Sequence, residues 1–280
     1  MASTQRTHPI VFNPVPAPLA EDAPSLRLLS YNIQAGIATS QYRDYVFHGW
    51  KHVLPSADRI RNLDHIAGLL RQFDIVGLQE TDDGSLRSHF LNQTEYLSLR
   101  SGLPHWSSRL NRDLGHWGQH ALGLLARTQP LNIEKHPLPG RIPGRGVLLA
   151  DFAWQGQSLR IIVSHLSLSQ RARRQQLTRL IELCAEHPGP KIVMADFNCT
   201  PDNADLQKLC NQANLKLPAD SPDTYPNWRP NRAIDHILVS PEIVIESVEA
   251  LRFGVSDHAP LAMQIALTPP DSPHLQANAS

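Results

Sequence analysis

Short apolar runs recur along the chain and predict β-strands. Most of them are continuous rather than alternating and rich in Ile, Val and Leu, which is typical of strands that are buried on both faces. The predicted strands are Leu26–Ile33, Asp74–Glu80, His120–Arg127, Gly146–Trp154, Leu159–Leu166, Lys191–Phe197, Ala233–Ser240 and Ala259–Leu267.

Two further segments carry apolar residues at helical spacing. The first segment follows Ser56, a candidate cap, and its apolar face consists of Ile60, Leu63, Ile66, Ala67 and Leu70. The second segment begins near Ser167 or Ser169 and is expected to end at Gly189. Its apolar stripe consists of Leu177, Leu180, Ile181 and Cys184. Strands and helices intermix without strict alternation, so we predict an α/β sandwich of two sheets with helices outside. Two long connections, Thr39–Pro55 and Thr81–Gln119, are expected to shape a pocket.

Charge and cysteine content narrow the function classes. The 280 residues include 26 basic and 26 acidic side chains, so the formal net charge is zero. This balance disfavours a broad basic surface that coats duplex nucleic acid. The three cysteines form no CxxC pair, so no disulfide framework or zinc site is predicted. We therefore expect a reducing, cytoplasmic location.

The chain ends differ in composition from its middle. Residues 1–25 are rich in proline and lack the apolar core of a secretion signal, so we expect an extended leader. Residues 269–280 are expected to be a disordered tail, and residues 26–268 a single catalytic domain. No apolar run approaches the roughly 20 residues of a membrane span, so no transmembrane segment is predicted. The sequence indicates no obligate protein partner.

Polar residues at the ends of the predicted strands are the most informative feature. They are Asn32, Glu80, His165, Asp196, Asn198, Asp235, Asp257 and His258. Each one alone has a simple structural explanation, such as a turn, a cap or a satisfied core histidine. Burying all of them would cost several kcal/mol each unless they pair with one another or with a cation, so we expect them to converge.

Their chemistry points to a phosphoester hydrolase. Carboxylate and amide oxygens without a thiolate suit Mg²⁺ or Mn²⁺ rather than zinc. Two histidines add donors for a developing anion and a group that can protonate a leaving oxygen. Asp235 could orient His258 and favour its charged form. This inventory suits metal-assisted hydrolysis, whereas the GxSxG, GxGxxG and Walker patterns are absent.

Six blocks in order resemble the endonuclease/exonuclease/phosphatase superfamily, which includes apurinic-site endonucleases, DNase I and neutral sphingomyelinases. The blocks are "SYNIQ", "GLQET", "SHLSL", "ADFNCTPD", "IDHILVS" and "SDHAPL". The resemblance implies a four-layer α/β sandwich with one divalent-metal site at the edge of two packed sheets. It also implies that Glu80 is the principal Mg²⁺ (or Mn²⁺) ligand, beside Asn32 and Asp257.

The same resemblance assigns the remaining roles. Asp196 would orient or deprotonate the attacking water, and Asn198 would hold a phosphate oxygen. His258, braced by Asp235, would stabilise the transition state. His165 would stabilise the same charge or protonate the leaving group.

Two blocks depart from the family pattern. The first block reads Asn32-Ile33-Gln34 where apurinic-site enzymes commonly have Asn-x-Asp, which argues against a second metal there. The histidine of "SHL" matches the sphingomyelinase and DNase I pattern. In "GQHA", Gln119 or His120 stands where the family has an asparagine.

Several substrate classes fit the residues of this sequence. Candidate substrate-binding residues are Arg109, Arg112, His120 and Arg145. A phosphoester in a small molecule, a nucleic acid or a lipid headgroup would suit them, and a phosphodiester is favoured. The alternatives are a repair-type endonuclease or exonuclease, a sphingomyelinase-like phosphodiesterase, or a catalytically silent scaffold of the same fold.

Overall fold

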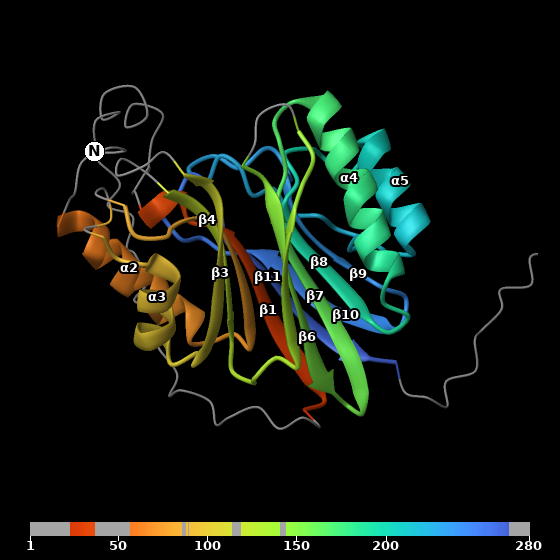
Figure 1. Ribbon diagram of the computed structural model, residues 1–280, viewed down its shortest axis with the longest axis horizontal. Helices are drawn as coiled ribbons and strands as arrows, with labels where there is room; N and C mark the ends of the chain where they lie inside the picture. Colours follow the sequence, from red (N-terminus) through yellow and green to blue (C-terminus); the bar gives the residue numbers. More distant parts are fainter. Residues whose placement is uncertain are drawn as a thin grey trace, which may run out of the picture.

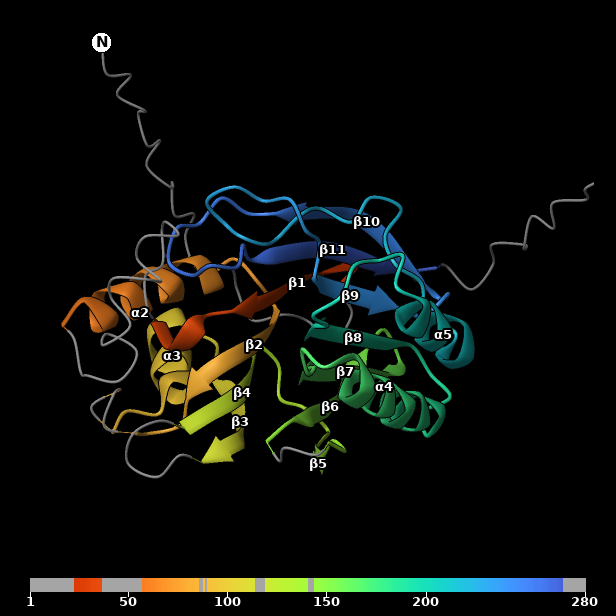
Figure 2. The ribbon, with the colours of Figure 1, turned by 90° about the horizontal axis from the view of Figure 1, so that it is seen from above.

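The computed structural model describes residues 23–36, 57–85, 88, 90–113, 119–140 and 144–268. Two mixed β-sheets lie face to face, and pairs of helices cover their outer faces (Figure 1). Seen from above, α2 and α3 lie on one outer side and α4 and α5 on the other (Figure 2). The layers therefore run helices, sheet, sheet, helices, and the predicted four-layer α/β sandwich is confirmed.

The first sheet has six strands in the order β10-β11-β1-β2-β4-β3. Its strands are β1 (Ser25–Asn32), β2 (Ile75–Asp82), β3 (His105–Asp113), β4 (Gln119–Ala126), β10 (Ile243–Ala250) and β11 (Leu261–Leu267). β1 and β2 are parallel, and every other pair in this sheet is antiparallel. A short 3₁₀ turn, η1 (Gln34–Gly36), follows β1.

The second sheet has five strands in the order β5-β6-β7-β8-β9. Its strands are β5 (Asn132–Pro137), β6 (Gly146–Trp154), β7 (Gln157–His165), β8 (Lys191–Asp196) and β9 (Asp235–Val239). Only β7 and β8 run parallel. The helices are α2 (Ala57–Leu70), α3 (Gln93–Ser101), α4 (Gln170–Ala185) and α5 (Ala204–Ala213).

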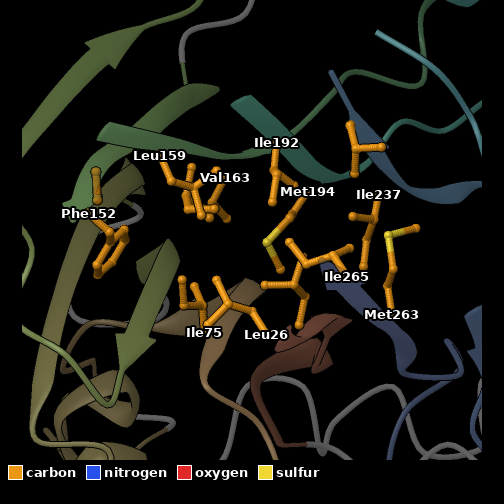
Figure 3. Close-up of a cluster of buried hydrophobic side chains, with 14 of the residues drawn as sticks. Leu26, Ile75, Phe152, Leu159, Val163, Ile192, Met194, Ile237, Met263 and Ile265 are labelled. Atoms are coloured by element: carbon orange, nitrogen blue, oxygen red, sulfur yellow. The ribbon is translucent and has the colours of Figure 1, made fainter. Parts of the chain in front are cut away.

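Three apolar clusters hold the layers together. The largest lies between the sheets, where Leu26, Val163, Met194 and Ile265 point into the shared space (Figure 3). The other two clusters lie between each sheet and its helices. Beyond one end of the inter-sheet cluster, where β7 and β8 end, the buried side chains are polar.

Several predicted elements need correction. The segment Thr81–Gln119 is not an irregular connection, since it contains α3 and β3. The α3 helix is short and polar, so it lacks an apolar stripe that would predict it. Its ends are defined by capping residues instead. Asn92 caps its first turn by accepting a hydrogen bond from the Glu95 amide, and Gly102 ends it with a left-handed φ of 73°.

The helix expected to end at Gly189 ends at Ala185. The structure also contains α5, β5 and β10, which the apolar pattern does not predict. Ser56 and the connection Thr39–Pro55 lie outside the described residues, as do the predicted tail and all of the leader except residues 23–25. Within the described part of the chain, no helix has the length and apolar character needed to cross a membrane.

Candidate active site

Polar side chains occupy the inward-facing positions at one end of the inter-sheet core. Side chains alternate between the two faces of a strand, and Val163 and Met194 belong to this core. His165 and Asp196 lie two positions further along the same strands, so they face the same space. His165 pairs with Asp196 across the sheet, and Asp196 pairs with Asp235. These three residues form one lateral row across β7, β8 and β9.

Amide groups from two segments hold the central carboxylate of this row. The side chain of Asn32, at the end of β1, donates a hydrogen bond to Asp196 Oδ2 at 3.2 Å. The backbone amide of Asn198 donates to Asp196 Oδ1 at 3.0 Å, and the Asn198 side chain donates to the Leu166 carbonyl at 2.9 Å. Asn198 has a left-handed φ of 53°, a conformation that asparagine adopts more readily than most residues.

Glu80 reaches the site through an irregularity in β2. By alternation it would face the helices, because Val76 and Leu78 on its side of the strand pack against them. A bulge between Leu78 and Thr81 and a left-handed φ of 54° at Glu80 redirect the chain. Glu80 Oε1 then lies 3.9 Å from His165 Nδ1. The bulge therefore brings a partly exposed carboxylate to the polar row.

A buried acid–imidazole pair lies on the other side of Asp196. Asp235 Oδ2 is 2.8 Å from His258 Nδ1 and also accepts the Thr224 hydroxyl at 2.5 Å. Burial alone would lower the pKa of His258, but the carboxylates of Asp235 and Asp196 outweigh it and raise this pKa to about 10. His258 is therefore a buried cation at neutral pH, and its Nε2 lies 3.8 Å from Asp196 Oδ2.

Burial gives Asp196 and His165 unusual proton affinities. Burial and the nearby charge of Asp235 raise the pKa of Asp196 to about 7, although His258 opposes the shift. Burial and the positive charges of Arg145, His258 and His120 lower the pKa of His165 well below its usual range. His165 Nε2 lies 3.3 Å from Asp196 Oδ2, so a neutral imidazole stands beside a carboxylate that gains and loses its proton near neutral pH.

Oxygen ligands for a cation gather where Glu80 approaches Asp257. Burial and the charge of Glu80 raise the pKa of Asp257, although the charge of His258 opposes them, so the two carboxylates repel each other. Gln34 Nε2 donates to Asp257 Oδ2 at 3.4 Å, and the Gln34 amide donates to Asn32 Oδ1 at 3.2 Å. Two carboxylates and an amide oxygen are the hard donors that Mg²⁺ and Mn²⁺ prefer, so these residues fit such an ion.

A second group of possible ligands overlaps the acid–imidazole pair. Single ligand atoms of Asp196, Asp235 and His258 lie within 4.8 Å of one another. However, His258 Nδ1 and Asp235 Oδ2 are hydrogen-bonded to each other. A cation at this point would have to displace that bond and would stand next to a buried imidazolium. The group around Glu80 and Asp257 is therefore the better cation site.

The candidate substrate-binding residues come from both sheets. Arg109 on β3 and Arg145 before β6 belong to different sheets, and His120 lies in β4. The charges of Arg145 and His120 both act on His165. Arg112 pairs with His120 through the backbone, but its side chain lies outside the described residues.

The polar pattern at the strand ends does not reveal three supporting residues. Thr224 donates its hydroxyl to Asp235, and the Ser256 hydroxyl donates to the Asn32 carbonyl at 2.7 Å. Gln34 donates a hydrogen bond from its side-chain amide to Asp257. Ser256 and Gln34 are close in sequence to Asp257 and Asn32, which is a usable signal. Thr224 lies 11 residues before Asp235, and nothing in the sequence indicates the contact.

Known protein sequences are similar to this chain over part or most of its length. The sequence model of the Endonuclease/Exonuclease/phosphatase family matches residues 29–258. A UPF0294 protein of Vibrio vulnificus (strain CMCP6) is 28% identical over 133 residues, which cover 45% of this chain and 46% of that protein. The chain therefore matches about half the length of this curated relative.

Two solved structures show the same fold at low identity. An endonuclease/exonuclease/phosphatase from Beutenbergia cavernae has a TM-score of 0.68 and 18% identity, covering 87% of this chain and 72% of that chain. A mannosyl-6-phosphatase from Bacteroides thetaiotaomicron has a TM-score of 0.62 and 18% identity, covering 86% of this chain and 100% of that chain. At these identities the similarity establishes the fold alone.

Proposed function

Because this chain belongs to the endonuclease/exonuclease/phosphatase family, we propose that it is a metal-dependent hydrolase that cleaves phosphodiester bonds with water. The main support for this proposal is the cluster of polar side chains around Asp196. Strand ends and loops far apart in sequence join in one continuous cluster, in which Asp196 contacts Asn32, His165 and His258. Costly buried charges arranged in this way are typical of a catalytic site.

Asn32, Glu80 and Asp257 would hold one Mg²⁺ or Mn²⁺, with Glu80 as the principal ligand. The bound cation would supply positive charge to a phosphoryl oxygen. Glu80 suits this role because its side chain is 29% exposed and can meet a hydrated ion. The repulsion between Glu80 and Asp257 is a further reason for a cation between them.

Asp196 would act as the general base. Its pKa of about 7 lets it accept a proton near neutral pH, which is the condition for efficient general-base catalysis. The water oxygen forms a bond to phosphorus as its proton passes to Asp196, and the bond to the leaving oxygen breaks, so that this oxygen departs with the electron pair and takes up a proton from water. Asn198, fixed to the Leu166 carbonyl and to Asp196, would hold a phosphoryl oxygen beside this carboxylate.

The two histidines would stabilise the charge that develops. His258 is a cation held by Asp235, so it would bind the additional negative charge on the phosphoryl oxygens. His165 is neutral and buried, so it would act as a hydrogen-bond donor rather than as a cation. We assign these roles to the pair because both lie within 4 Å of Asp196.

A chromogenic diester tests the proposal. Purified protein, freed of metal with a chelator, should hydrolyse bis-p-nitrophenyl phosphate only after Mg²⁺ or Mn²⁺ is added. Glu80→Ala and His258→Ala should each abolish hydrolysis while circular dichroism stays unchanged. Glu242→Ala is the matched control, because Glu242 lies at the far end of β10, next to Thr268. Full activity in the Glu80 or His258 variant, or activity without metal, would contradict the proposal.

A further inference from the structure

We propose that Arg109, His120 and Arg145 form an anion subsite beside His165 that binds a second phosphate group of the substrate. The inference rests on the proposed hydrolase function and names its substrate class. The preferred substrate is then a phosphodiester that carries another phosphate near the scissile one, rather than an isolated diester.

Arg109 points into the space between the sheets. It pairs with Leu122 across β3 and β4, and residues directly opposite on antiparallel strands share a face. Leu122 belongs to the inter-sheet core, so Arg109 faces inward as well. His120 lies two positions from Leu122 on β4 and therefore faces the same way. Two basic side chains thus continue the polar layer that contains the catalytic row.

The Arg109 guanidinium packs against Gly146 of β6 in the opposite sheet. A Cβ atom built on Gly146 would lie 1.9 Å from Arg109 Cζ and 1.9 Å from Nη1. No other residue at position 146 would leave room for the guanidinium in this position. Gly146 therefore forms a cradle that holds the charged group against β6, directly after Arg145.

Arg109 has no acidic partner in the part of the chain that the structure describes. Its hydrogen-bond acceptors are the Leu110 carbonyl, at 3.4 Å, and the Asn111 side-chain oxygen, and both groups are neutral. Burial lowers the pKa of Arg109, and among the described side chains no carboxylate opposes this effect. Burying a cation without a counter-charge costs free energy, and a bound anion would offset this cost. The position of the Arg109 guanidinium therefore favours the binding of an anion.

The topology places this charge next to the catalytic row. Gly146 begins β6, which pairs with β7, and the Gly146 carbonyl accepts the Ser164 hydroxyl at 3.0 Å. Ser164 precedes His165. Because β6 flanks β7 on the side opposite β8, Arg109 is one to two strand spacings from the row, roughly 5–10 Å. One sugar or inositol ring spans such a separation.

Matched substrates with one scissile phosphodiester test the inference. The nucleotide set is TpT, pTpT and TpTp, in which the added phosphate lies on either side of the bond. The inositol set is glycerophosphoinositol and its 4-phosphate, which distinguishes a lipid-headgroup source from a nucleotide source. In at least one set the added phosphate should raise kcat/KM roughly 10- to 100-fold, the range expected for charge-assisted hydrogen bonds.

Two variants connect that preference to the subsite. Arg109→Ala should reduce the ratio of kcat/KM for phosphorylated and unphosphorylated substrates to within about twofold of unity. Gly146→Ala should reduce the same ratio by displacing the guanidinium. Arg179→Ala, on the surface of α4, is the control and should preserve it. Thermal midpoints establish that each variant is folded.

The outcomes separate this inference from the function on which it rests. Hydrolysis of no substrate in either set would contradict the proposed function itself. Hydrolysis without any preference for the added phosphate would overturn the subsite and leave the hydrolase function standing. A preference that survives in both folded variants at Arg109 and Gly146 would also overturn the subsite.

Discussion

Two β–α–β units, one in each sheet, supply the central side chains, and they do so with different backbones. In the second sheet, β7 and β8 run parallel, and His165 and Asp196 end their strands as direct neighbours. In the first sheet, β1 and β2 also run parallel, but Glu80 lies on a bulge with a left-handed φ. The η1 turn after β1 is left-handed as well, with φ values of 47° at Gln34 and 52° at Ala35.

The difference in backbone matches a difference in burial. The side chains of His165 and Asp196 are 5% and 2% exposed, whereas that of Glu80 is 29% exposed. Deep burial shifts the pKa values that proton transfer depends on, and partial exposure leaves a carboxylate open to a hydrated cation. We therefore expect proton transfer to depend on the regular unit, β7–α4–β8, and metal binding to depend on the irregular unit, β1–α2–β2.

The largest effect should follow from removing the proposed general base, Asp196, of the regular unit. Asp196→Asn should lower kcat/KM about 1,000-fold, within the range of general-base catalysis. Wild-type activity should rise as the pH passes about 7, where Asp196 loses its proton, and the variant should lack this rise. The measurement is a pH profile of kcat/KM at saturating Mg²⁺.

The same variant has a stability signature. The pKa of Asp196 is raised from 3.8 to about 7 in the folded protein, so the folded state holds this proton more tightly than the unfolded state does. Stability is therefore lost as the pH rises from about 4 to 7. Without metal, Asp196→Asn should have a higher Tm than wild type at pH 8 and a similar Tm at pH 4. A lower Tm at pH 8 would contradict the proposed cost of this buried carboxylate.

A smaller effect is expected when His258 loses its partner. Asp235→Asn should lower kcat/KM roughly 10- to 100-fold, because a less cationic imidazole stabilises developing charge less well. The pKa of His258 is raised above 6.5 to about 10, so its charge is complete below pH 6.5 and is lost as the pH rises through about 10. The alkaline fall in activity should therefore move to lower pH in the variant. The exposed control Asp220→Asn should leave the profile unchanged.

The smallest effect concerns the connection between the irregular unit and the Asp257 loop. Ser256 donates its hydroxyl to the Asn32 carbonyl at 2.7 Å in a fully buried position. Ser256→Ala should lower the free energy of unfolding by about 1 kcal/mol and reduce kcat only a few-fold. Urea unfolding and steady-state kinetics measure both, with the exposed Ser247→Ala as control. Loss of most activity would show that the irregular unit depends on this bond for its geometry.

Sequence periodicity anticipates the regular unit far better than the irregular one. In β7 and β8, His165 and Asp196 directly follow the apolar runs without a bulge, so once the two strands are paired, regular alternation places their side chains next to each other on the inward face. Alternation gives the wrong face for Glu80, because a single extra residue in β2 reverses the pattern. Its place at a strand end makes Glu80 a candidate, and the resemblance to the family supplies its role as a metal ligand, but alternation does not predict that its side chain turns toward the site.

The apolar pattern of the sequence does not predict β5 and β10, because both strands are largely exposed. β5 is an edge strand whose residues are exposed or half-buried throughout, and β10, an edge strand of the other sheet, buries only Ile243 fully. Such strands lack the continuous apolar runs that mark the central ones. The Arg109–Gly146 contact also leaves no sequence signal, because it joins edge strand β3 to the opposite sheet.

Under the proposed function, the lateral row of His165, Asp196 and Asp235 makes turnover a sensitive reporter of strand pairing. A slip of β8 by one residue would turn Asp196 toward α4 and α5 and would bring Ala195 or Phe197 beside His165. Most backbone hydrogen bonds would survive such a slip, so far-ultraviolet spectra would barely change. A misaligned but compact population of this protein would therefore be inactive. The fraction of active molecules after refolding would measure how often the central strands pair in the correct register.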